Sequence, residues 1–492
     1  MEYFASIDQG TTSTRFAIFD SEENQVAIHQ IEIEQIYPLP NYVEHNPNEI
    51  WESVKSCISE VGKKFDLNKL SSIGITNQRE TTVAWSKSTG LPLYNAIVWQ
   101  DTRTQDICDE ITEIDELKSH FKNTGLPVAT YFSLSKILWL LRNVEDVKVA
   151  AKTEDLCFGT IDSWILYKLT GKHLTDVTNA SRTLLFDLQT LSWNPKIIDY
   201  FDIPGSSLPE VKPSMSYFAE NTSFVENVPI TAVLGDQQAS LFGHKAFKTG
   251  NSKNTYGTGC FLLVNTGNNI ISSKNGLIST VGYQIENQPP VYALEGSVAV
   301  AGSSIQWLRD NIGLINKSSD VEKLALLVKD NGGVYFVPAF SGLFSPHWDP
   351  TARGTIVGMS GHTNKSHIAR SVLESVGFQN DELIKAFELD LNLKLSSISV
   401  DGGMTTNNLL MQFQSDISDI NIQSLKIKEI TAFGAALASF TFINQTPLES
   451  IVNKVSKSQT WSPNMNGNLR ENYLARWNKA IEKAKTMEEK AA

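Results

Sequence analysis

Near its N-terminus the chain places one carboxylate, one amide, one glycine and three hydroxyl residues in a single short segment. Residues 8–13 read Asp-Gln-Gly-Thr-Thr-Ser and lie between two apolar, β-prone runs, 4–7 and 15–19, which predicts a turn between two strands. Such a turn directs backbone N–H groups and small hydroxyls toward one side, and its glycine lets an anion approach closely. The segment therefore favours a phosphate-binding turn, although Asp, Gly and Thr are also common in ordinary polar turns.

Asp8 is the acidic residue of this turn, and by itself it would repel a triphosphate. The same carboxylate becomes useful when a divalent cation is present, because it can orient Mg²⁺ or its water shell against the phosphate oxygens. The turn therefore indicates a site for a nucleotide with Mg²⁺, and Asp8 is the expected residue near the metal.

Two later segments repeat the combination of glycine, hydroxyl residues and an apolar run. Segment 254–267 places Gly-Thr-Gly before an apolar run, and segment 398–417 reads as a strand, paired glycines and a helix. Gly402 and Gly403 offer an open backbone surface at a helix entrance, which suits the adenosine end or the α-phosphate of a nucleotide. Three separated glycine-rich turns favour a nucleotide clamp over an isolated polar turn.

These turns need sheets to hold them, and the rest of the sequence alternates strand patterns with amphipathic helices. Asn46, Pro47 and Glu49 predict a helix start with an N-cap, a first-turn proline and a capping-box acid. The 3-4-3 spacing of apolar residues in this helix and in two later ones is typical of helices that pack on a sheet. The apolar positions are Ile50, Val54, Cys57, Ile58, Val61 and Phe65, then Leu134, Ile137, Leu138, Leu141 and Val144, then Ile368, Val372, Leu373 and Val376.

The similarity between the first and second hairpins predicts two similar α/β domains that face each other across a cleft. A chain of 492 residues is too long for one compact core, so two domains of roughly 250 residues are expected. We place them at 1–245 and 246–492, so that each begins with one phosphate hairpin. From about residue 456 the polar sequence, rich in Lys and Glu, predicts a closing surface helix with a frayed end.

Composition argues against several classes of protein. The formal net charge of −12 disfavours a role that depends on holding nucleic acid or an anionic membrane. The four cysteines, at 57, 108, 157 and 260, show neither a C-x-x-C spacing nor an adjacent His, which predicts buried, reduced thiols. The N-terminus lacks a basic region before a long apolar run, so we expect a cytoplasmic protein without membrane insertion.

Two such hairpins followed by a late Asp-Gly-Gly turn resemble the actin-like ATPase superfamily. Within it, the sequence is similar to the glycerol kinases of the FGGY carbohydrate kinase family from about residue 3 to residue 445. The stretches that carry the resemblance are IDQGTTSTR, GITNQRETTVAW, NAIVWQDTRT, YFSLSK, GDQQASLFGH, NTYGTGCF, ALEGSVAVAGSSIQWLRD and DGGMTTNNLLMQFQSDI. The resemblance implies two actin-like, ribonuclease H-like domains and ATP-dependent phosphorylation of glycerol to sn-glycerol 3-phosphate.

The resemblance also implies a role for individual residues. Asp8 would lie near Mg²⁺, and Asp236 would be the base that accepts the proton of the attacking hydroxyl. The residues implied to bind glycerol are Arg79, Glu80, Tyr131, Asp236 and Gln237, with Trp99 and Phe261 beside its carbon chain. The residues implied to bind ATP or ADP are Thr11, Thr12, Ser13, Arg15 and Thr258 at the phosphates, and Gly302, Gln306, Gly403 and Asn407 elsewhere.

These assignments agree with the chemistry of a small alcohol, although each residue also has an ordinary structural interpretation. Arg79 and Glu80 follow a short strand pattern and offer donors beside an acceptor, where a solvated surface pair is the alternative. Asp236 precedes an apolar-periodic run and could be a helix N-cap. Trp99 and Phe261 could form a narrow slot for a three-carbon chain or could be core aromatics.

Two other functions fit parts of the pattern. One is an FGGY kinase that acts on a longer polyol or sugar, and the other is an actin-like ATP switch without enzymatic turnover. The five residues matched to the glycerol site argue against both, because a switch needs only the nucleotide residues and a longer sugar needs a different site floor. We also expect a homo-oligomer, either a dimer or a tetramer.

Overall fold

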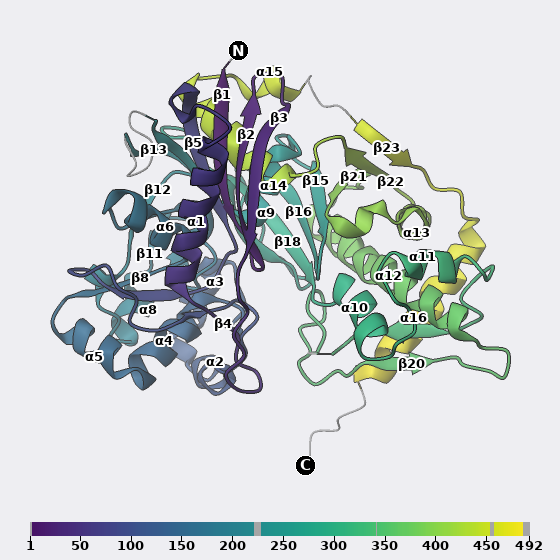
Figure 1. The fold of residues 1–492 in the computed structure, drawn as a ribbon. Coiled ribbons are helices and arrows are strands. Elements are labelled where there is room, and N and C mark those ends of the chain that lie inside the picture. Colours follow the sequence, from purple (N-terminus) through teal and green to yellow (C-terminus); the bar gives the residue numbers. More distant parts are fainter. Residues whose placement is uncertain (1, 221–227, 341, 453–456, 486–492) are drawn as a thin grey trace.

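The computed structural model describes residues 2–220, 228–340, 342–452 and 457–485. Figure 1 shows two lobes side by side, each built around one large sheet, with two helices, α9 (Asp236–Gly243) and α14 (Ile430–Ile443), between them. The first sheet has six strands and the second has seven. The expected α/β fold with two similar domains is confirmed.

The first sheet has the strand order β13-β14-β5-β1-β2-β3. β1 runs antiparallel to β2 and parallel to β5, and β14 also runs parallel to β5. The carboxyl ends of β1, β5 and β14 therefore meet at one edge of the sheet, where ligands of open α/β sheets usually bind. The strands are β1 (Tyr3–Gln9), β2 (Ser13–Asp20), β3 (Gln25–Glu32), β5 (Leu70–Asn77), β13 (Met215–Ala219) and β14 (Ile230–Gly235).

The second sheet repeats this pattern, with the order β17-β18-β16-β15-β21-β22-β23. β15 is antiparallel to β16 and parallel to β21, and β22 runs parallel to β21. The second hairpin thus occupies the place in its sheet that the first hairpin occupies in the other. The strands are β15 (Ser252–Tyr256), β16 (Cys260–Gly267), β17 (Ile278–Tyr283), β18 (Val291–Val298), β21 (Ser397–Asp401), β22 (Asn421–Leu425) and β23 (Lys457–Trp461).

Helix α1 (Pro47–Gly62) packs on the first sheet with the predicted apolar face. Its N-cap is Asn46, whose side chain accepts the Asn48 backbone N–H, as predicted. The predicted capping box is wrong, because the Glu49 carboxylate instead accepts the Glu34 backbone N–H at 2.9 Å. The other helices of the first lobe are α2 (Gln105–Thr112), α3 (Lys118–Thr124), α4 (Ser133–Asn143), α5 (Glu145–Lys152), α6 (Ile161–Thr170), α7 (Val177–Ala180) and α8 (Pro195–Tyr200).

Much of the segment between β5 and β14 forms an additional layer, which pairs short strands and has its own apolar cluster. This layer holds two predicted site residues, Trp99 and Tyr131, beside the edge of the first sheet. Its paired short strands are β6 (Val83–Ser86) with β8 (Leu156–Gly159), β9 (Leu174–Asp176) with β12 (Glu210–Lys212), and β10 (Phe186–Asp187) with β11 (Ser192–Trp193). Its strand β7 (Ala96–Ile97) pairs with β4 (Glu44–His45), which precedes β5.

Helix α14 comes from the C-terminal part of the chain but packs against β5, β14 and β1 of the first sheet. The approach is very close: a Cβ atom added to Gly74 would lie 2.1 Å from the Ala435 carbonyl oxygen. One added to Gly434 would lie 1.8 Å from the Ala239 carbonyl oxygen of α9. Glycine is required at both positions, and late residues complete the core of the first lobe. The domain boundary near residue 245 stays a prediction.

The second lobe carries α12 (Lys365–Leu391) and α13 (Asn408–Ser418). The predicted apolar positions of α12 are buried, with the exception of half-buried Ile368. The prediction of a lone surface helix at the end is wrong in part, because β23 first extends the sheet and α16 (Gly467–Lys485) then buries Trp477 and Ile481. The remaining elements are α10 (Gly302–Asp310), α11 (Asp320–Ala325), β19 (Tyr335–Val337), β20 (Thr355–Val357) and α15 (Leu448–Val452).

The cysteine prediction is confirmed, because all four cysteines are free and buried. Across the described residues, none of the helices has the length and apolar character that crossing a membrane requires.

Candidate active site

The carboxyl ends of the three parallel strands in the first sheet bring together predicted residues that are far apart in the sequence. β1 ends with Asp8 and Gln9, β5 is followed by Arg79 and Glu80, and β14 is followed by Asp236. The Arg79 Nε atom lies 3.3 Å from Asp236 Oδ1. A cation and a carboxylate therefore share the edge of the sheet where the topology predicts a ligand.

Asp236 is the first residue of helix α9, so the predicted N-cap is wrong by one position and Gly235 is the cap. Its Oδ1 atom accepts the Gln237 backbone N–H at 2.7 Å, and 26 % of its side-chain surface is exposed. Burial raises the pKa of Asp236, while the nearby charges of Arg79 and Lys253 oppose that rise. The position in the first helical turn also favours the ionised carboxylate.

Arg79 and Glu80 are held by two residues that the sequence analysis did not select, Arg182 and Glu295. Arg79 donates to both carboxylate oxygens of Glu295, at 2.5 and 3.0 Å. Arg182 donates to Glu80 at 2.6 Å and to Glu295 at 3.1 Å. All four side chains are at most 2 % exposed, and we call them the buried ion cluster.

The buried ion cluster joins the two lobes, because Glu295 lies on β18 of the second sheet and its three partners belong to the first lobe. Burial alone would raise the pKa of Glu295, but Arg182 and Arg79 outweigh it and lower the pKa to about 2. For Glu80 burial is the larger effect, and its pKa is raised despite the two arginines. The cluster therefore keeps Glu295 ionised and makes Glu80 the more readily protonated carboxyl.

The backbone of Glu80 adopts a left-handed conformation with φ of +59°, which is uncommon for a residue with a long side chain. Its carbonyl oxygen accepts hydrogen bonds from Ser133 at 2.9 Å and Thr82 at 3.0 Å. These contacts hold the strained backbone in place, and strain of this kind is concentrated at functional sites.

The predicted aromatic residues lie next to one another and connect both hairpins. The Trp99 indole N–H donates to the Thr11 hydroxyl of the first hairpin at 2.9 Å. The Trp99 ring centroid is 5.6 Å from that of Tyr131 and 6.1 Å from that of Phe261, which follows the second hairpin. The ring of Phe344, which the sequence analysis did not select, lies 6.2 Å from Tyr131. These rings form an aromatic wall with members from both lobes.

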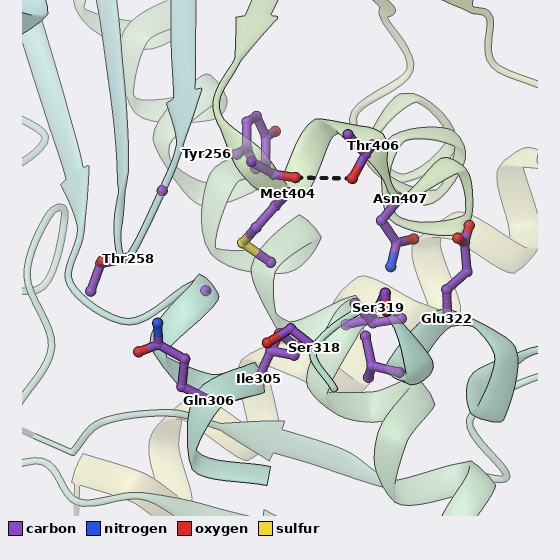
Figure 2. A pocket seen from close by; sticks show the side chains of 15 residues that line it. Tyr256, Thr258, Ile305, Gln306, Ser318, Ser319, Glu322, Met404, Thr406 and Asn407 are labelled. Carbon is purple, nitrogen blue, oxygen red and sulfur yellow. Dashed lines mark hydrogen bonds between the residues drawn. The ribbon is translucent and has the colours of Figure 1, made fainter. Parts of the chain in front are cut away.

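Five predicted nucleotide residues line one cavity of about 460 Å³ in the second lobe. Figure 2 shows Gln306 of α10 and Asn407, the N-cap of α13, on opposite sides of this cavity, with Thr258 at its rim. Other lining residues, including Ser318, Ser319, Glu322 and Met404, were not predicted. The five predicted residues are Thr258, Gly302, Gln306, Gly403 and Asn407.

The remaining predicted nucleotide residues form the first hairpin and do not line that cavity. The Gly10 backbone N–H donates to the Ser13 carbonyl at 2.9 Å, which closes the predicted turn, and Thr12 is exposed at its tip. Arg15 is the cross-strand neighbour of Asp8, and its Nη1 atom lies 3.5 Å from the Asp8 carboxylate. The phosphate role of these residues stays a prediction.

Asp8 is buried, and burial raises its pKa to about 6 even though Arg15 opposes the rise. The charge of Asp236 is one of the causes of this rise in pKa, so the two carboxylates lie within electrostatic range of each other. Such a pair favours a cation between or beside its members. Among the described residues, no group of three or more His, Cys, Asp or Glu side chains could hold a metal by itself. Mg²⁺ fits this donor set, because it binds through one or two carboxylates together with substrate phosphates and water.

Most of the chain matches one family. Residues 3–243 match the N-terminal domain of the FGGY family of carbohydrate kinases, and residues 252–441 match its C-terminal domain. This chain belongs to that family.

The relatives of this FGGY kinase match it along its length. It is 48 % identical to a glycerol kinase from Clavibacter michiganensis subsp. michiganensis and 49 % identical to one from Leifsonia xyli subsp. xyli, over 98 % of this chain and 97 % of each relative. The crystal structure of Plasmodium falciparum glycerol kinase with ADP has a TM-score of 0.91 and 39 % identity, covering 98 % of both chains. A ligand-bound xylulose kinase from Lactobacillus acidophilus, at TM-score 0.86 and 21 % identity, covers 98 % of this chain and 97 % of its own and shares the fold.

The sequence analysis of this FGGY kinase missed two residues of the buried ion cluster, Glu295 and Arg182. Only Glu295 has a recognisable signal in the sequence. Glu295 is the single charge within the largely buried strand Val291–Val298, and a charge in a buried strand requires a partner. Arg182 has no comparable signal, because it lies in an irregular segment after α7.

Proposed function

We propose that this FGGY kinase transfers the γ-phosphoryl group of ATP to glycerol, giving sn-glycerol 3-phosphate. The observation that carries the proposal is the meeting of Arg79, Asp236 and the Trp99–Tyr131 aromatic wall at one edge of the first sheet. This edge offers a base, hydrogen-bond donors and an apolar wall, which together suit a small alcohol. Full-length relatives named glycerol kinase support the same activity.

In this proposal Asp236 aligns the attacking hydroxyl and accepts its proton late in the transfer. Both of its contacts, to Arg79 and to the Gln237 N–H, involve Oδ1. Among the described residues, Oδ2 has no such contact, so it is open to the hydroxyl of a bound alcohol. Because phosphoryl transfer has a loose transition state, alignment contributes more than early deprotonation.

The remaining glycerol residues would recognise the other two hydroxyls and the carbon chain. Arg79 supplies donors and Glu80 an acceptor, and the buried ion cluster fixes both side chains. Tyr131 is buried, and its pKa is raised far above the usual value, mainly by burial. Its phenol therefore stays protonated and can donate a hydrogen bond.

The nucleotide would lie between the hairpins and extend into the cavity of the second lobe. Thr11, Thr12, Ser13 and Arg15 would contact its phosphates from one side and Thr258 from the other. The ADP in the Plasmodium relative supports an adenine nucleotide. Mg²⁺ held near Asp8 would supply positive charge that offsets the phosphate oxygens during transfer.

A coupled assay of ADP release with Mg-ATP and a series of polyols tests the proposal. We expect turnover with glycerol, weaker turnover with four- and five-carbon polyols, and slow ATP hydrolysis without an alcohol, because lobe closure excludes water. Hydrolysis without glycerol that exceeds transfer to glycerol would favour an ATP switch. A preference for longer polyols would favour another FGGY kinase activity.

We expect Trp99→Ala to raise KM for glycerol about tenfold, because it removes one ring of the aromatic wall and the hydrogen bond to Thr11. The measurement is steady-state kinetics with varied glycerol at saturating Mg-ATP. Trp193→Ala is the control, since Trp193 is also half-buried and donates to the Pro209 carbonyl at 2.8 Å away from the site. An unchanged KM for glycerol in the Trp99 variant would contradict the prediction that Trp99 forms part of a narrow slot for a three-carbon chain.

We expect Gly403→Val to raise KM for ATP about tenfold or more and to leave KM for glycerol unchanged. A Cβ atom at Gly403 would meet no other atom within 4 Å, and Gly403 lines the cavity. The larger side chain would therefore occupy nucleotide space without disturbing the fold. Gly361→Val is the matched control, because Gly361 has equal free space but lies outside the cavity. Equal ATP kinetics in both variants would exclude Gly403 from the nucleotide site.

A further inference from the structure

Lys253 is a buried cation to which the mechanism above gives no role. It lies on β15, and its side chain is 0 % exposed. Its Nζ atom donates to Gln237 Oε1 and, at 3.0 Å, to the Thr255 hydroxyl. Within the described residues it forms no ion pair with a carboxylate. Burying an ammonium group with two neutral acceptors is costly, which indicates that these contacts serve a function.

The first reason is the orientation of the Gln237 side chain. An ammonium group can only donate hydrogen bonds, so it must contact the amide oxygen of Gln237 and not the amide nitrogen. The Nε2 group of Gln237 therefore points away from Lys253. Gln237 follows Asp236 directly in α9, at the edge of the first sheet. Lys253 thus leaves the donor end of the Gln237 amide, and not its acceptor end, available to a ligand.

The second reason is the charge near Asp236. The ionisable groups around Lys253 are Asp236 of α9, His244 directly after α9, Arg79, Glu295 of β18, Asp401 of β21 and Cys260 of β16. Burial lowers the pKa of Lys253 to about 8, while the carboxylates of Asp401, Asp236 and Glu295 oppose the decrease. In return, the ammonium charge lowers the pKa of Asp236. Together with Arg79, it offsets the cost of keeping that carboxylate ionised inside the site.

The contacts of Lys253 also continue toward the nucleotide cavity. The Thr255 hydroxyl accepts from Lys253, so its own proton is available for Asp401 Oδ2 at 3.1 Å. Asp401 Oδ2 also accepts from Ser240 at 2.9 Å and lies 2.7 Å from His244 Nε2. Asp401 directly precedes the glycines that enter the cavity lining at Gly403. Lys253 therefore stands between the two proposed substrate sites.

We propose that Lys253 is a positioning residue that fixes the amide of Gln237 as a donor to the alcohol. The inference rests on the proposed glycerol kinase function and adds a residue to its alcohol site. Lys253 acts through its neighbours and need not touch either substrate.

The test compares two Lys253 variants with one control by steady-state kinetics with varied glycerol at saturating Mg-ATP. Lys253→Met removes the donor to Gln237, so KM for glycerol should rise about tenfold or more. Lys253→Gln removes the charge but keeps a donor for Gln237. Its KM for glycerol should therefore stay within about threefold of that of the unmodified enzyme.

Lys245→Met is the control, because Lys245 is also buried but contacts Glu23, at 2.7 Å, away from the site. It should change thermal stability without changing KM for glycerol. If Lys253→Met behaves like this control, the inference is overturned. If Lys253→Met fails to fold, a rise in KM for glycerol of about tenfold or more in Lys253→Gln, which keeps the donor, overturns it. Absence of glycerol-dependent ADP release from the unmodified enzyme would instead contradict the proposed function.

Discussion

Asp236→Asn is expected to lower kcat for glycerol phosphorylation by about 10³-fold while changing KM for glycerol by less than about threefold. The amide has nearly the same shape as the carboxylate, so it can still contact the alcohol. It cannot accept the proton that the hydroxyl loses during transfer. The effect should therefore fall on the chemical step, and steady-state kinetics with saturating Mg-ATP measures both constants.

The pH dependence gives a second measure of the same residue. Burial raises the pKa of Asp236, and the group must be ionised to act as a base. Activity of the unmodified enzyme should therefore fall as the pH decreases through this raised pKa, and the Asn variant should lack that limb. Asp310→Asn is the control, because Asp310 is an exposed carboxylate paired with Arg309 at 2.6 Å. A near-normal kcat in Asp236→Asn would remove Asp236 from the catalytic role.

Glu295→Gln is expected to lower the free energy of unfolding by about 3–5 kcal/mol, because it leaves two buried arginines without their shared carboxylate. Glu295 accepts three hydrogen bonds from Arg79 and Arg182, and an uncharged amide cannot replace that charge. Arg79 would also lose its fixed position, so KM for glycerol should rise. Urea denaturation followed by tryptophan fluorescence measures the first effect.

The sign of the pH dependence follows from the pKa of Glu295, which the arginines lower from 4.5 to about 2. Its contribution is fully present above the unfolded pKa and is lost as the pH falls toward 2. The stability difference between the two proteins should therefore shrink in acid. Glu374→Gln is the matched control, because Glu374 is equally buried but has a pKa raised to about 7 by burial. A loss in Glu295→Gln no larger than in this control would contradict the role of the buried ion cluster.

The sequence predicted the local parts of this site because their signals are short-range. The turn at Gly10 and the turn at Gly257 each lie between strands that are adjacent in sequence, so residue type and spacing identify them. The order of β1, β5 and β14 then brings their carboxyl ends together. As a result, Asp8, Arg79 and Asp236 lie at the same edge of the sheet.

The buried ion cluster could not be predicted in the same way, because its contacts are long-range. Arg79 and Glu295 are 216 residues apart and Arg182 and Glu295 are 113 apart, and no local pattern couples them. The predictions for two helix starts were also wrong, one because of a competing contact and one by a shift of one residue. The Glu49 carboxylate accepts the Glu34 backbone N–H and does not complete a capping box with its own N-cap residue. Asp236 is the first residue of α9, and Gly235 is the N-cap.

The packing of α14 on the first sheet has a consequence for how the protein is made. Gly74 is synthesised early, whereas the Ala435 carbonyl against which it packs appears more than three hundred residues later. During translation the face of the first sheet that α14 covers therefore stays exposed until most of the polypeptide has been synthesised. The N-terminal half therefore cannot complete its core before α14 has been synthesised.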